Sequence, residues 1–209
     1  MAAGLSTSVS APSMVKRIGA AMAAKGIAML DAPVSGGTVG AEAATIAIMV
    51  GGDKKVFDDA LPVLQSFSAN VIHMGELGTG TVAKLVNNMM AFCNAAAAAE
   101  GLMLGVTAGL DPNKLVQVIA SSSGNSAIFK AFSERALSGK FSPPSFALNL
   151  AHKDLHLAME LADELDVPLP QGSATHNLQR MARKMGLGDN DSSAILQVYE
   201  TVLKKTVKP

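Results

Sequence analysis

A lysine and an asparagine four residues apart, Lys84 and Asn88, are the first candidates for chemistry in this 209-residue chain. They lie near the start of a segment, residues 75–110, rich in Ala, Leu, Val and Met, which have good or tolerable helix propensity. In a helix the two side chains share one face. The helix dipole and apolar surroundings would both lower the pKa of Lys84, which suits proton transfer near neutral pH. Spacing alone favours a plainer alternative, a solvated lysine at a helix start.

The segment that carries both residues predicts one long helix, from about 80 to 108. Glycines precede it, and Gly109 before Asp111-Pro112 indicates its end. A helix of about 30 residues is roughly 45 Å long, enough to cross a small domain. Its sides are apolar nearly all round, so we expect it to be buried inside a bundle or between subunits. Five polar or charged residues interrupt the apolar run and argue against a membrane span.

The residues before this helix alternate between short apolar runs and amphipathic stretches. Residues 27–35, 45–52 and 69–75 have strand length, whereas 12–26 and 53–68 have helical patterns. Residues 1–10 hold no strand long enough to begin a domain. Five more helical patterns follow the long helix. The pattern predicts an α/β part, residues 1–74, followed by an all-α part, residues 75–209, with a long interdomain helix.

One motif that an α/β nucleotide-binding domain normally has is missing. Such a domain begins with a strand followed by G-x-G-x-x-G. Residues 35–40, SGGTVG, come nearest, but they lack the first glycine and lead within five residues into a strand. A phosphate cradle needs a helix N-terminus at that point. We therefore expect the α/β part to be the second half of a larger, Rossmann-like unit.

Composition excludes several kinds of partner. The formal net charge is zero and no basic block stands out, which argues against nucleic acid and an anionic membrane surface. The lone Cys93 excludes an intramolecular disulfide and fits a reducing compartment, the cytoplasm or, with a targeting segment, a mitochondrial or plastid matrix. His152 and His156 have i,i+4 spacing, but no carboxylate or Cys spacing supports a metal site, so no metal is expected.

Three motifs together resemble the β-hydroxyacid dehydrogenases. They are DAPVSGGTVGAEAATIAIMVGG at 31–52, GELGTGTVAKLVNN at 75–88 and KDL at 153–155. This family includes 3-hydroxyisobutyrate dehydrogenase, tartronate semialdehyde reductase and the glyoxylate/succinic semialdehyde reductases. The resemblance spans essentially residues 5–200, without the family's first ninety or so residues and their glycine-rich loop. It implies an NAD- or NADP-dependent oxidoreductase that interconverts a small β-hydroxyacid and its semialdehyde, with this chain alone expected to be inactive.

The resemblance also implies roles for the residues of the first two motifs. Ser35, Gly36 and Gly37 would hold the substrate carboxylate, since a glycine turn lets backbone N–H groups approach an anion closely. Lys84 would be the general acid that protonates the carbonyl oxygen, and the base in the reverse direction. Asn88 would bind and orient the substrate. Without the resemblance, residues 35–37 would be read as a plain turn.

Four further roles follow from the same resemblance. Lys153 and Asp154 would close the site from the helical part, with Lys153 near the nicotinamide. Phe146 would shape the substrate pocket, and Thr7 would touch the cofactor. The simpler alternatives are a solvated helix pair for Lys153 and Asp154, and an ordinary core residue for Phe146.

Two other functions remain open at this point. One is a non-catalytic oligomerisation module that keeps the fold, because the family resembled here uses its long helix and helical domain to form homo-oligomers. The other is oxidative decarboxylation of the 6-phosphogluconate type, which needs a basic phosphate pocket that the sequence does not show. The sequence does not decide the exact substrate, or between NAD and NADP.

Overall fold

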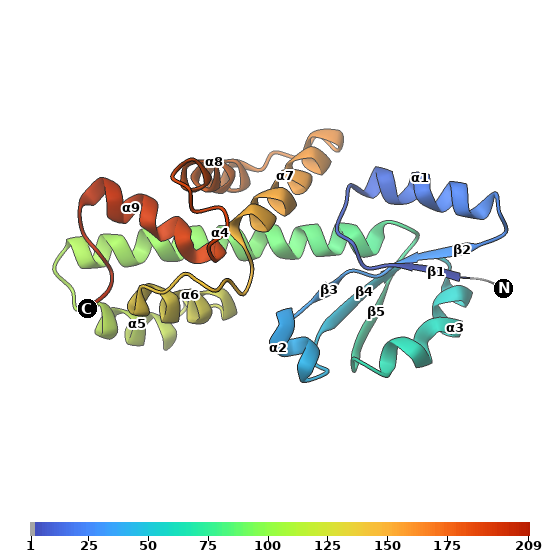
Figure 1. The fold of residues 1–209 in the computed structure, drawn as a ribbon, viewed down its shortest axis with the longest axis horizontal. Coiled ribbons are helices and arrows are strands. Elements are labelled where there is room, and N and C mark those ends of the chain that lie inside the picture. The colour runs from blue at the N-terminus through green and yellow to red at the C-terminus, as the bar shows by residue number, and fades with distance from the viewer. Residues whose placement is uncertain (1–2) are drawn as a thin grey trace. The chain divides into compact units, whose positions relative to one another are not determined.

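The computed structural model describes residues 3–209, and the chain divides into two compact units. The first comprises the chain up to Asn87 together with Glu160–Asp166, and the second comprises Asn88–Met159 and Val167–Pro209. One long helix, α4 (Thr79–Thr107), contributes to both (Figure 1). The boundary expected at residue 74 coincides with the end of the last strand, whereas the compact units divide inside α4. Where the functional domains divide stays a prediction.

The first unit contains a mixed five-stranded sheet. Its strands are β1 (Ala3–Ser6), β2 (Ala28–Asp31), β3 (Val34–Ser35), β4 (Ala47–Gly51) and β5 (Asn70–Gly75). The pairs β1–β2 and β4–β5 are parallel, whereas β2 and β3 both pair antiparallel with β4. β2 and β3 are two parts of the apolar run expected at 27–35, which Pro33 interrupts because proline has no N–H to donate. Residues 1–10 were expected to hold no strand long enough to begin a domain, yet the four-residue β1 pairs with β2 in the sheet.

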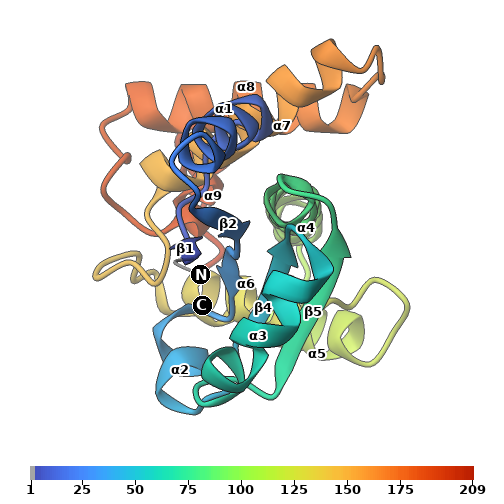
Figure 2. The same cartoon turned by 90° about the vertical axis from the view of Figure 1, so that its right-hand side faces the viewer.

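Helices α1 (Pro12–Ala23) and α3 (Lys54–Gln65) cover the two faces of the sheet (Figures 1 and 2). α3 begins where the Asp53 carboxylate accepts hydrogen bonds from the N–H groups of residues 55 and 56, which would otherwise lack partners. Phe57 and Leu64 of α3 are buried against the sheet residues Leu30, Ile48 and Val50. The strand and helix predictions for residues 45–75 are therefore confirmed. A short helix, α2 (Gly37–Glu42), separates β3 from β4.

The second unit is helical, as expected. After α4 come α5 (Pro112–Ala120), α6 (Ala127–Ser138), α7 (Leu148–Glu164), α8 (Pro170–Lys184), the 3-10 turn η1 (Ser192–Ile195) and α9 (Leu196–Leu203). The C-terminal half of α4 lies in the core of this unit. The fully buried members of that core include Ala99, Leu102, Leu148, Ala182, Ala194 and Leu196. The expected fold class, a Rossmann-like α/β part followed by an all-α part, is confirmed.

α4 is not buried on all sides, so that expectation is wrong for the single chain. One side carries fully buried residues such as Leu85, Ala99 and Leu102, but Val86, Met90 and Leu104 are exposed by 45, 58 and 74%. By length and composition alone α4 could cross a membrane, a property that core helices of soluble proteins share. Its buried side packs in the helical core, and its exposed apolar side is available for contact with another surface.

Candidate functional site

The start of α4 is fixed by a carboxylate from the sheet. Asp31, the last residue of β2, is 1% exposed, and its two oxygens accept hydrogen bonds from the backbone N–H groups of Gly78 (2.7 Å) and Thr81 (2.6 Å). The first N–H groups of a helix lack intrahelical partners, and a carboxylate there also meets the positive end of the helix dipole. Asp31 therefore caps α4 from 47 and 50 residues earlier in the chain. The position of Lys84, one turn after Thr81, depends on this cap.

Two glycines allow α4 to approach the sheet closely. A Cβ atom at Gly80 would lie 2.4 Å from the carbonyl oxygen of Met49 and 2.7 Å from that of Asp31. A Cβ atom at Gly51 would lie 2.4 Å from the Asp31 carboxylate. Atoms cannot lie this close without a collision, so both positions require glycine. The glycines before the long helix thus have a packing reason as well as a conformational one.

Ser35, Gly36 and Gly37 form a turn between β3 and α2. Gly36 has φ 137° and Gly37 φ 65°, values that residues with side chains rarely adopt. A Cβ atom at Gly37 would meet no atom within 4 Å, so the backbone is open to approach there, whereas Gly36 packs on Ile46. The Asn87 Nδ2 of α4 donates a hydrogen bond to the Ser35 Oγ at 3.4 Å. The structure thus places the predicted carboxylate-binding turn next to the first third of α4.

The expectation that residues 35–40 lead within five residues into a strand, with no helix start there, is wrong because α2 intervenes. Gly36 precedes α2 as its N-cap residue, and the sequence of α2, GTVGAE, contains two glycines and so has low helix propensity. The strand expected there starts only at Ala47. With six residues, α2 has a shorter row of aligned peptide dipoles than the full helix of a dinucleotide-binding motif.

Lys84 lies on α4 and is only 9% exposed. The adjacent Leu85 and the preceding turn's Thr81 are fully buried. Lys84 is therefore not the solvated lysine at a helix start that spacing alone favoured. Burying an ammonium group is costly unless it is paired, so such a position is typical of a lysine used in an ion pair or in chemistry. Its catalytic role remains a prediction.

Asn88, one turn further along α4, contacts α7. It is 6% exposed, and its Nδ2 donates a hydrogen bond to the Asp154 Oδ2 at 2.7 Å. An ionised carboxylate only accepts, so Asp154 determines which way the Asn88 amide points. Lys153 lies at 3.0 Å from the other oxygen of Asp154, with its own side chain half exposed. The structure thus brings three of the predicted site residues together in the second unit.

Phe146 lies in the loop before α7. Its ring stacks on that of Phe92 of α4, with 6.0 Å between centroids and an interplanar angle of 25°. Both rings belong to a small apolar cluster with the buried Ala151 and Leu155. Phe146 is half-buried, so it is placed both to complete this cluster and to present one side to a ligand.

A second buried carboxylate holds the loop that carries Phe146. Asp191 is 4% exposed and accepts hydrogen bonds from the N–H and Oγ of Ser145 at 2.9 and 2.7 Å, and from those of Ser193 at 3.1 and 2.6 Å. The Arg135 Nε lies 3.3 Å away. Burial raises the pKa of Asp191, but the hydrogen bonds from Ser193 and Ser145 outweigh burial and lower this pKa below its usual value.

The sequence of this chain matches two known protein families. Residues 78–199 match the family described as NAD-binding of NADP-dependent 3-hydroxyisobutyrate dehydrogenase, and residues 3–75 match the NAD binding domain of 6-phosphogluconate dehydrogenase. Over 190 residues the chain is 44% identical to 2-(hydroxymethyl)glutarate dehydrogenase of Eubacterium barkeri. This match covers 90% of this chain and 63% of that protein. The chain belongs to the β-hydroxyacid dehydrogenase family.

Two further relatives agree with this assignment. NAD-dependent L-serine dehydrogenase of Pseudomonas aeruginosa is 35% identical over 202 residues, covering 94% of this chain and 68% of that protein. The structure of Mycobacterium tuberculosis 3-hydroxyisobutyrate dehydrogenase with L-serine superposes with a TM-score of 0.86 at 32% identity, covering 94% of this chain and 69% of that one. The family predicted from the three motifs is confirmed. The chain spans 63% and 68% of the length of the two curated relatives.

Thr7 directly follows β1 and is exposed. Ligands of open α/β sheets bind outside the carboxyl ends of parallel strands. β1 and β2 are parallel, and Thr7 lies at that end of β1. Its position is compatible with the cofactor contact that the family resemblance implies, and its role stays a prediction.

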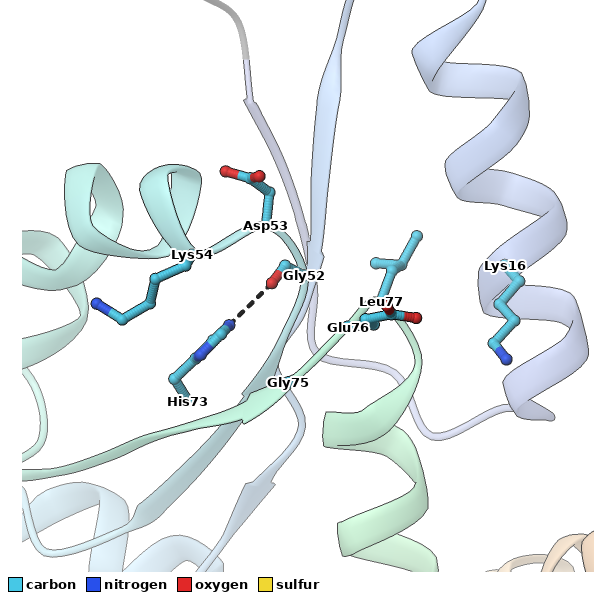
Figure 3. Close-up of a pocket in the computed structure, with 8 residues that line it drawn as sticks. All are labelled: Lys16, Gly52, Asp53, Lys54, His73, Gly75, Glu76 and Leu77. Carbon is cyan, nitrogen blue, oxygen red and sulfur yellow. Dashed lines mark hydrogen bonds between the residues drawn. The ribbon is translucent and has the colours of Figure 1, made fainter.

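A cavity of about 730 Å³ lies at the carboxyl ends of β4 and β5 (Figure 3). There the His73 Nε2 is 2.8 Å from the carbonyl oxygen of Gly52, so His73 donates and Gly52 accepts. None of the predicted site residues lines this cavity, which is bordered by Lys16, Gly52, Asp53, Lys54, His73, Gly75, Glu76 and Leu77. Asp31 pairs with Gly51, which directly precedes Gly52, so this opening lies next to the Asp31 end of β2.

His152 and His156, considered above for a metal, are joined by His176 of α8. The three rings stack nearly parallel, with 4.5 Å between the centroids of His152 and His176. Stacked rings do not direct their nitrogens to a common point. Within residues 3–209 no group of three or more His, Cys, Asp or Glu side chains is arranged to hold a metal ion.

Sequence reasoning missed three residues that position the site: Asp31, Asp191 and Asn87. Asp31 stands at the head of the first family motif and ends an apolar strand, an unusual place for a carboxylate that could have marked it. Asp191 precedes two serines in the pattern of a helix N-cap, which gives its local role but not its contact with Ser145, 46 residues earlier. No sequence signal indicated that Asn87 would reach Ser35.

Proposed function

We propose that this chain supplies the substrate-binding turn and the acid-base lysine of an NAD- or NADP-dependent oxidoreductase that interconverts a small β-hydroxyacid and its semialdehyde. The observation that carries the proposal is the buried Lys84, on a helix whose start is clamped by Asp31 and whose Asn87 reaches the open turn at Ser35. A fixed lysine beside a carboxylate-binding turn is what reduction of a carbonyl on a small acid requires.

We propose a role for each residue of the first unit from its position and contacts. The N–H groups of the turn at Ser35, Gly36 and Gly37 bind the substrate carboxylate. Lys84 gives a proton to the carbonyl oxygen as it is reduced, and takes it back when the alcohol is oxidised. Because a proton must move in both directions, the lysine has to exist in both protonation states during turnover.

The second unit is proposed to supply the residues that orient the substrate and complete the pocket. Asn88 hydrogen-bonds the substrate, with Asp154 fixing the direction of its amide. Lys153 lies near the nicotinamide end of the cofactor. Phe146 shapes the pocket for the substrate side chain, held in place by its stacking on Phe92.

We assign one end of the dinucleotide to residues of this chain. Thr7 and Lys153 would hold the nicotinamide end, and a bound NAD or NADP would supply or accept a hydride at the substrate carbon. The pyrophosphate needs a glycine-rich turn that opens a full helix. Within residues 3–209 the glycine turn after β3 leads only into the six-residue α2. We therefore assign no pyrophosphate contact to this chain.

The names of three relatives indicate a narrower class of substrate. 2-(Hydroxymethyl)glutarate, L-serine and 3-hydroxyisobutyrate all carry a CH₂OH group and a carboxylate on one carbon. They differ only in the remaining substituents of that carbon. We therefore propose a 2-substituted 3-hydroxypropanoate as substrate, with Phe146 among the residues that select the substituent. The reducing compartment that suits the lone Cys93 is the cytoplasm or an organelle matrix.

We further propose that the exposed apolar side of α4 is covered by a second copy of the chain. Val86, Met90 and Leu104 lie four and fourteen residues apart, which places them along one side of the helix. Contiguous apolar side chains exposed on a surface often mark a contact with another protein. Light scattering should report a dimer or larger oligomer, and Leu104→Glu should shift the mass toward the monomer. A monomer at micromolar concentration before any substitution would refute this part.

The function is tested with this chain placed after a glycine-rich dinucleotide-binding segment of the family. Oxidation of 3-hydroxyisobutyrate, L-serine and 2-(hydroxymethyl)glutarate is followed by absorbance of the reduced cofactor. We expect turnover of at least one of them, and none of the corresponding alcohols that lack the carboxylate. Cofactor binding without turnover of any hydroxyacid would favour the non-catalytic oligomerisation module instead.

A further inference from the structure

The C-terminal end of α8 borders a hollow of about 940 Å³ that none of the proposed catalytic residues lines. Arg180, Arg183 and Lys184 are spaced i, i+3 and i+4, so they lie on one side of the helix. His176, one turn before Arg180, continues the same side. The composition, with no net charge, did not indicate this concentration of basic groups. The hollow is lined by Asn149, Asn177, Arg180, Met181, Arg183, Lys184, Gly186, Gly188 and Asp189.

Part of this hollow is held in a fixed geometry. The Arg183 Nε donates a hydrogen bond to the Asn149 Oδ1 at 2.8 Å, and the Asn149 Nδ2 donates to the Asp189 Oδ1 at 3.1 Å. Gly188 packs directly on Asn149, because a Cβ atom there would lie 2.6 Å from its amide. The Nε bond orients the Arg183 guanidinium without using its two terminal nitrogens, which form the fork that binds carboxylates and phosphates.

The acidic groups around the hollow do not balance the basic ones. Asp189 is the one acidic residue among those that line it, against three cations. Within residues 3–209, no carboxylate lies within ion-pair distance of Arg180, Arg183 or Lys184. Cations near a helix C-terminus also offset the dipole, but that end carries only about half a negative charge. The dipole therefore offsets the charge of less than one of the three cations.

A stack of histidines behind the hollow experiences the same excess of positive charge. The rings of His152 and His176 lie 4.5 Å apart, and the His152 Nδ1 and His176 Nε2 are buried without hydrogen-bond partners among the described residues. Burial is the main cause that lowers the pKa values of His152 and His176, and with all causes together the pKa of His152 falls to about 4. The charged neighbours that lower both further are all basic: Arg180, Arg183 and His156.

We propose that this hollow is a binding site for a small oxyanion with two or more negative charges. An unbalanced group of two arginines and a lysine, with one guanidinium oriented by Asn149, matches a phosphate group or a dicarboxylate. A bound anion would offset the positive potential at His152 and His176, so their pKa values would rise on binding. The inference does not rest on the proposed function, because none of its residues takes part in the proposed reaction.

The test uses the 209-residue chain and inorganic phosphate as the probe. Calorimetry should detect phosphate binding, and NMR titration should show the imidazole pKa values of His152 and His176 rising in its presence. Arg180→Gln with Arg183→Gln should weaken phosphate binding about ten-fold or more, since two charge-assisted partners are removed. Lys114→Gln with Lys130→Gln, exposed residues on α5 and α6, changes the net charge equally and should leave binding unchanged.

Two further arms identify the anion. Glutarate binding as tightly as phosphate would assign the site to dicarboxylates, and preference for phosphate would assign it to phosphate groups; acetate should bind more weakly than either. The proposal is overturned if phosphate and glutarate do not bind, or if the control pair weakens binding as much as the arginine pair does. Binding of long polyanions only would also overturn it, because it would indicate a surface patch and no defined site.

Discussion

The two units of this chain each hold a site segment with a buried aspartate, and they do so differently. Asp31 accepts hydrogen bonds from two backbone N–H groups at the start of α4, and the helix dipole is the positive partner of its charge. Asp191 accepts from two serines through backbone and hydroxyl donors, with the Arg135 guanidinium beside it. Asp31 fixes the start of a rigid helix, whereas Asp191 fixes an irregular loop.

The two units therefore fix the positions of their site residues in different ways. Lys84 is positioned by one cap and two glycine contacts, because a helix transmits the position of its first turn to the next. Phe146 stands in a loop, so each N–H near it needs its own acceptor. A change at Asp31 should therefore be felt along α4, whereas a change at Asp191 should stay near the loop.

The largest effect is expected from Gly80→Ala. The added methyl would lie 2.4 Å from a backbone carbonyl, so α4 would have to move away from the sheet, at a cost of about 3 kcal/mol or more. Gly101→Ala is the matched control on the same helix, because no atom lies within 4 Å of its Cβ position. It should stabilise by about 0.5–1 kcal/mol through helix propensity. Urea unfolding at low protein concentration measures both, and equal effects would contradict the packing described at Gly80.

Asp31→Asn should have the next largest effect. The amide Nδ2 would face a backbone N–H that cannot rotate, leaving a buried donor without a partner at a cost of about 3 kcal/mol. Hydrogen exchange of the Gly78 and Thr81 amides should become faster than in the parent chain. Asp58→Asn, which changes an exposed carboxylate paired with Lys54, is the control and should cost less than about 1 kcal/mol. Unchanged exchange at Gly78 and Thr81 would argue against the cap.

Asp191→Asn also makes the new amide face a backbone N–H, but it should cost less, about 2 kcal/mol, because the hydroxyl of Ser145 or Ser193 can rotate to accept from the amide. Its effects should be confined to the loop around Phe146 and to η1. NMR chemical shifts are the measurement, and they should change near Phe92 and Phe146 but not at Gly78 or Thr81. Shifts of equal size at both places would remove the distinction between the two anchors.

The smallest predicted effect is a pH dependence within the second unit. The pKa values of His152, about 4, and of His176 are lowered in the folded chain, so the unfolded chain binds more protons below about pH 6.5. Stability should therefore be full above pH 6.5 and fall progressively toward pH 4. The contribution of Asp191, whose pKa is also lowered, should be lost only below about pH 3.8. His152→Gln with His176→Gln should flatten the first window, and an unchanged slope there would contradict the assignment.

Local signals in the sequence predicted the elements well. The long helix was expected from about 80 to 108 and runs from Thr79 to Thr107, because glycines and Asp111-Pro112 bound a run made mostly of helix formers, which Gly101 and Gly105 do not end. The motifs also indicated the correct family. The elements that were missed depend on distant partners: β1 is too short to be seen without β2, and α2 hides in a glycine- and alanine-rich loop.

The sequence predicted the residues of the candidate site, but not the hydrogen bonds that hold them in place. α7 begins at Leu148 and excludes Ser145 and Phe146, because the N–H groups of these two residues donate to Asp191 instead. The caps at Asp31 and Asp191 join residues about 46 to 50 positions apart. Periodicity and turn chemistry describe neighbours along the chain, so they carry no information on such contacts.

The most direct test of the proposed chemistry is the turnover number of Lys84→Ala, in the chain joined to a dinucleotide-binding segment. We expect kcat to fall about 10²- to 10⁴-fold, the usual contribution of a positioned acid or base, with folding retained. Lys84→Arg should not restore it, since a guanidinium stays protonated and cannot act as a base. Asn88→Ala should combine with Lys84→Ala non-additively, because both act on one substrate. Lys130→Ala is the exposed control and should leave kcat unchanged; a Lys84→Ala protein with near-native kcat would remove the lysine from the reaction and contradict the account.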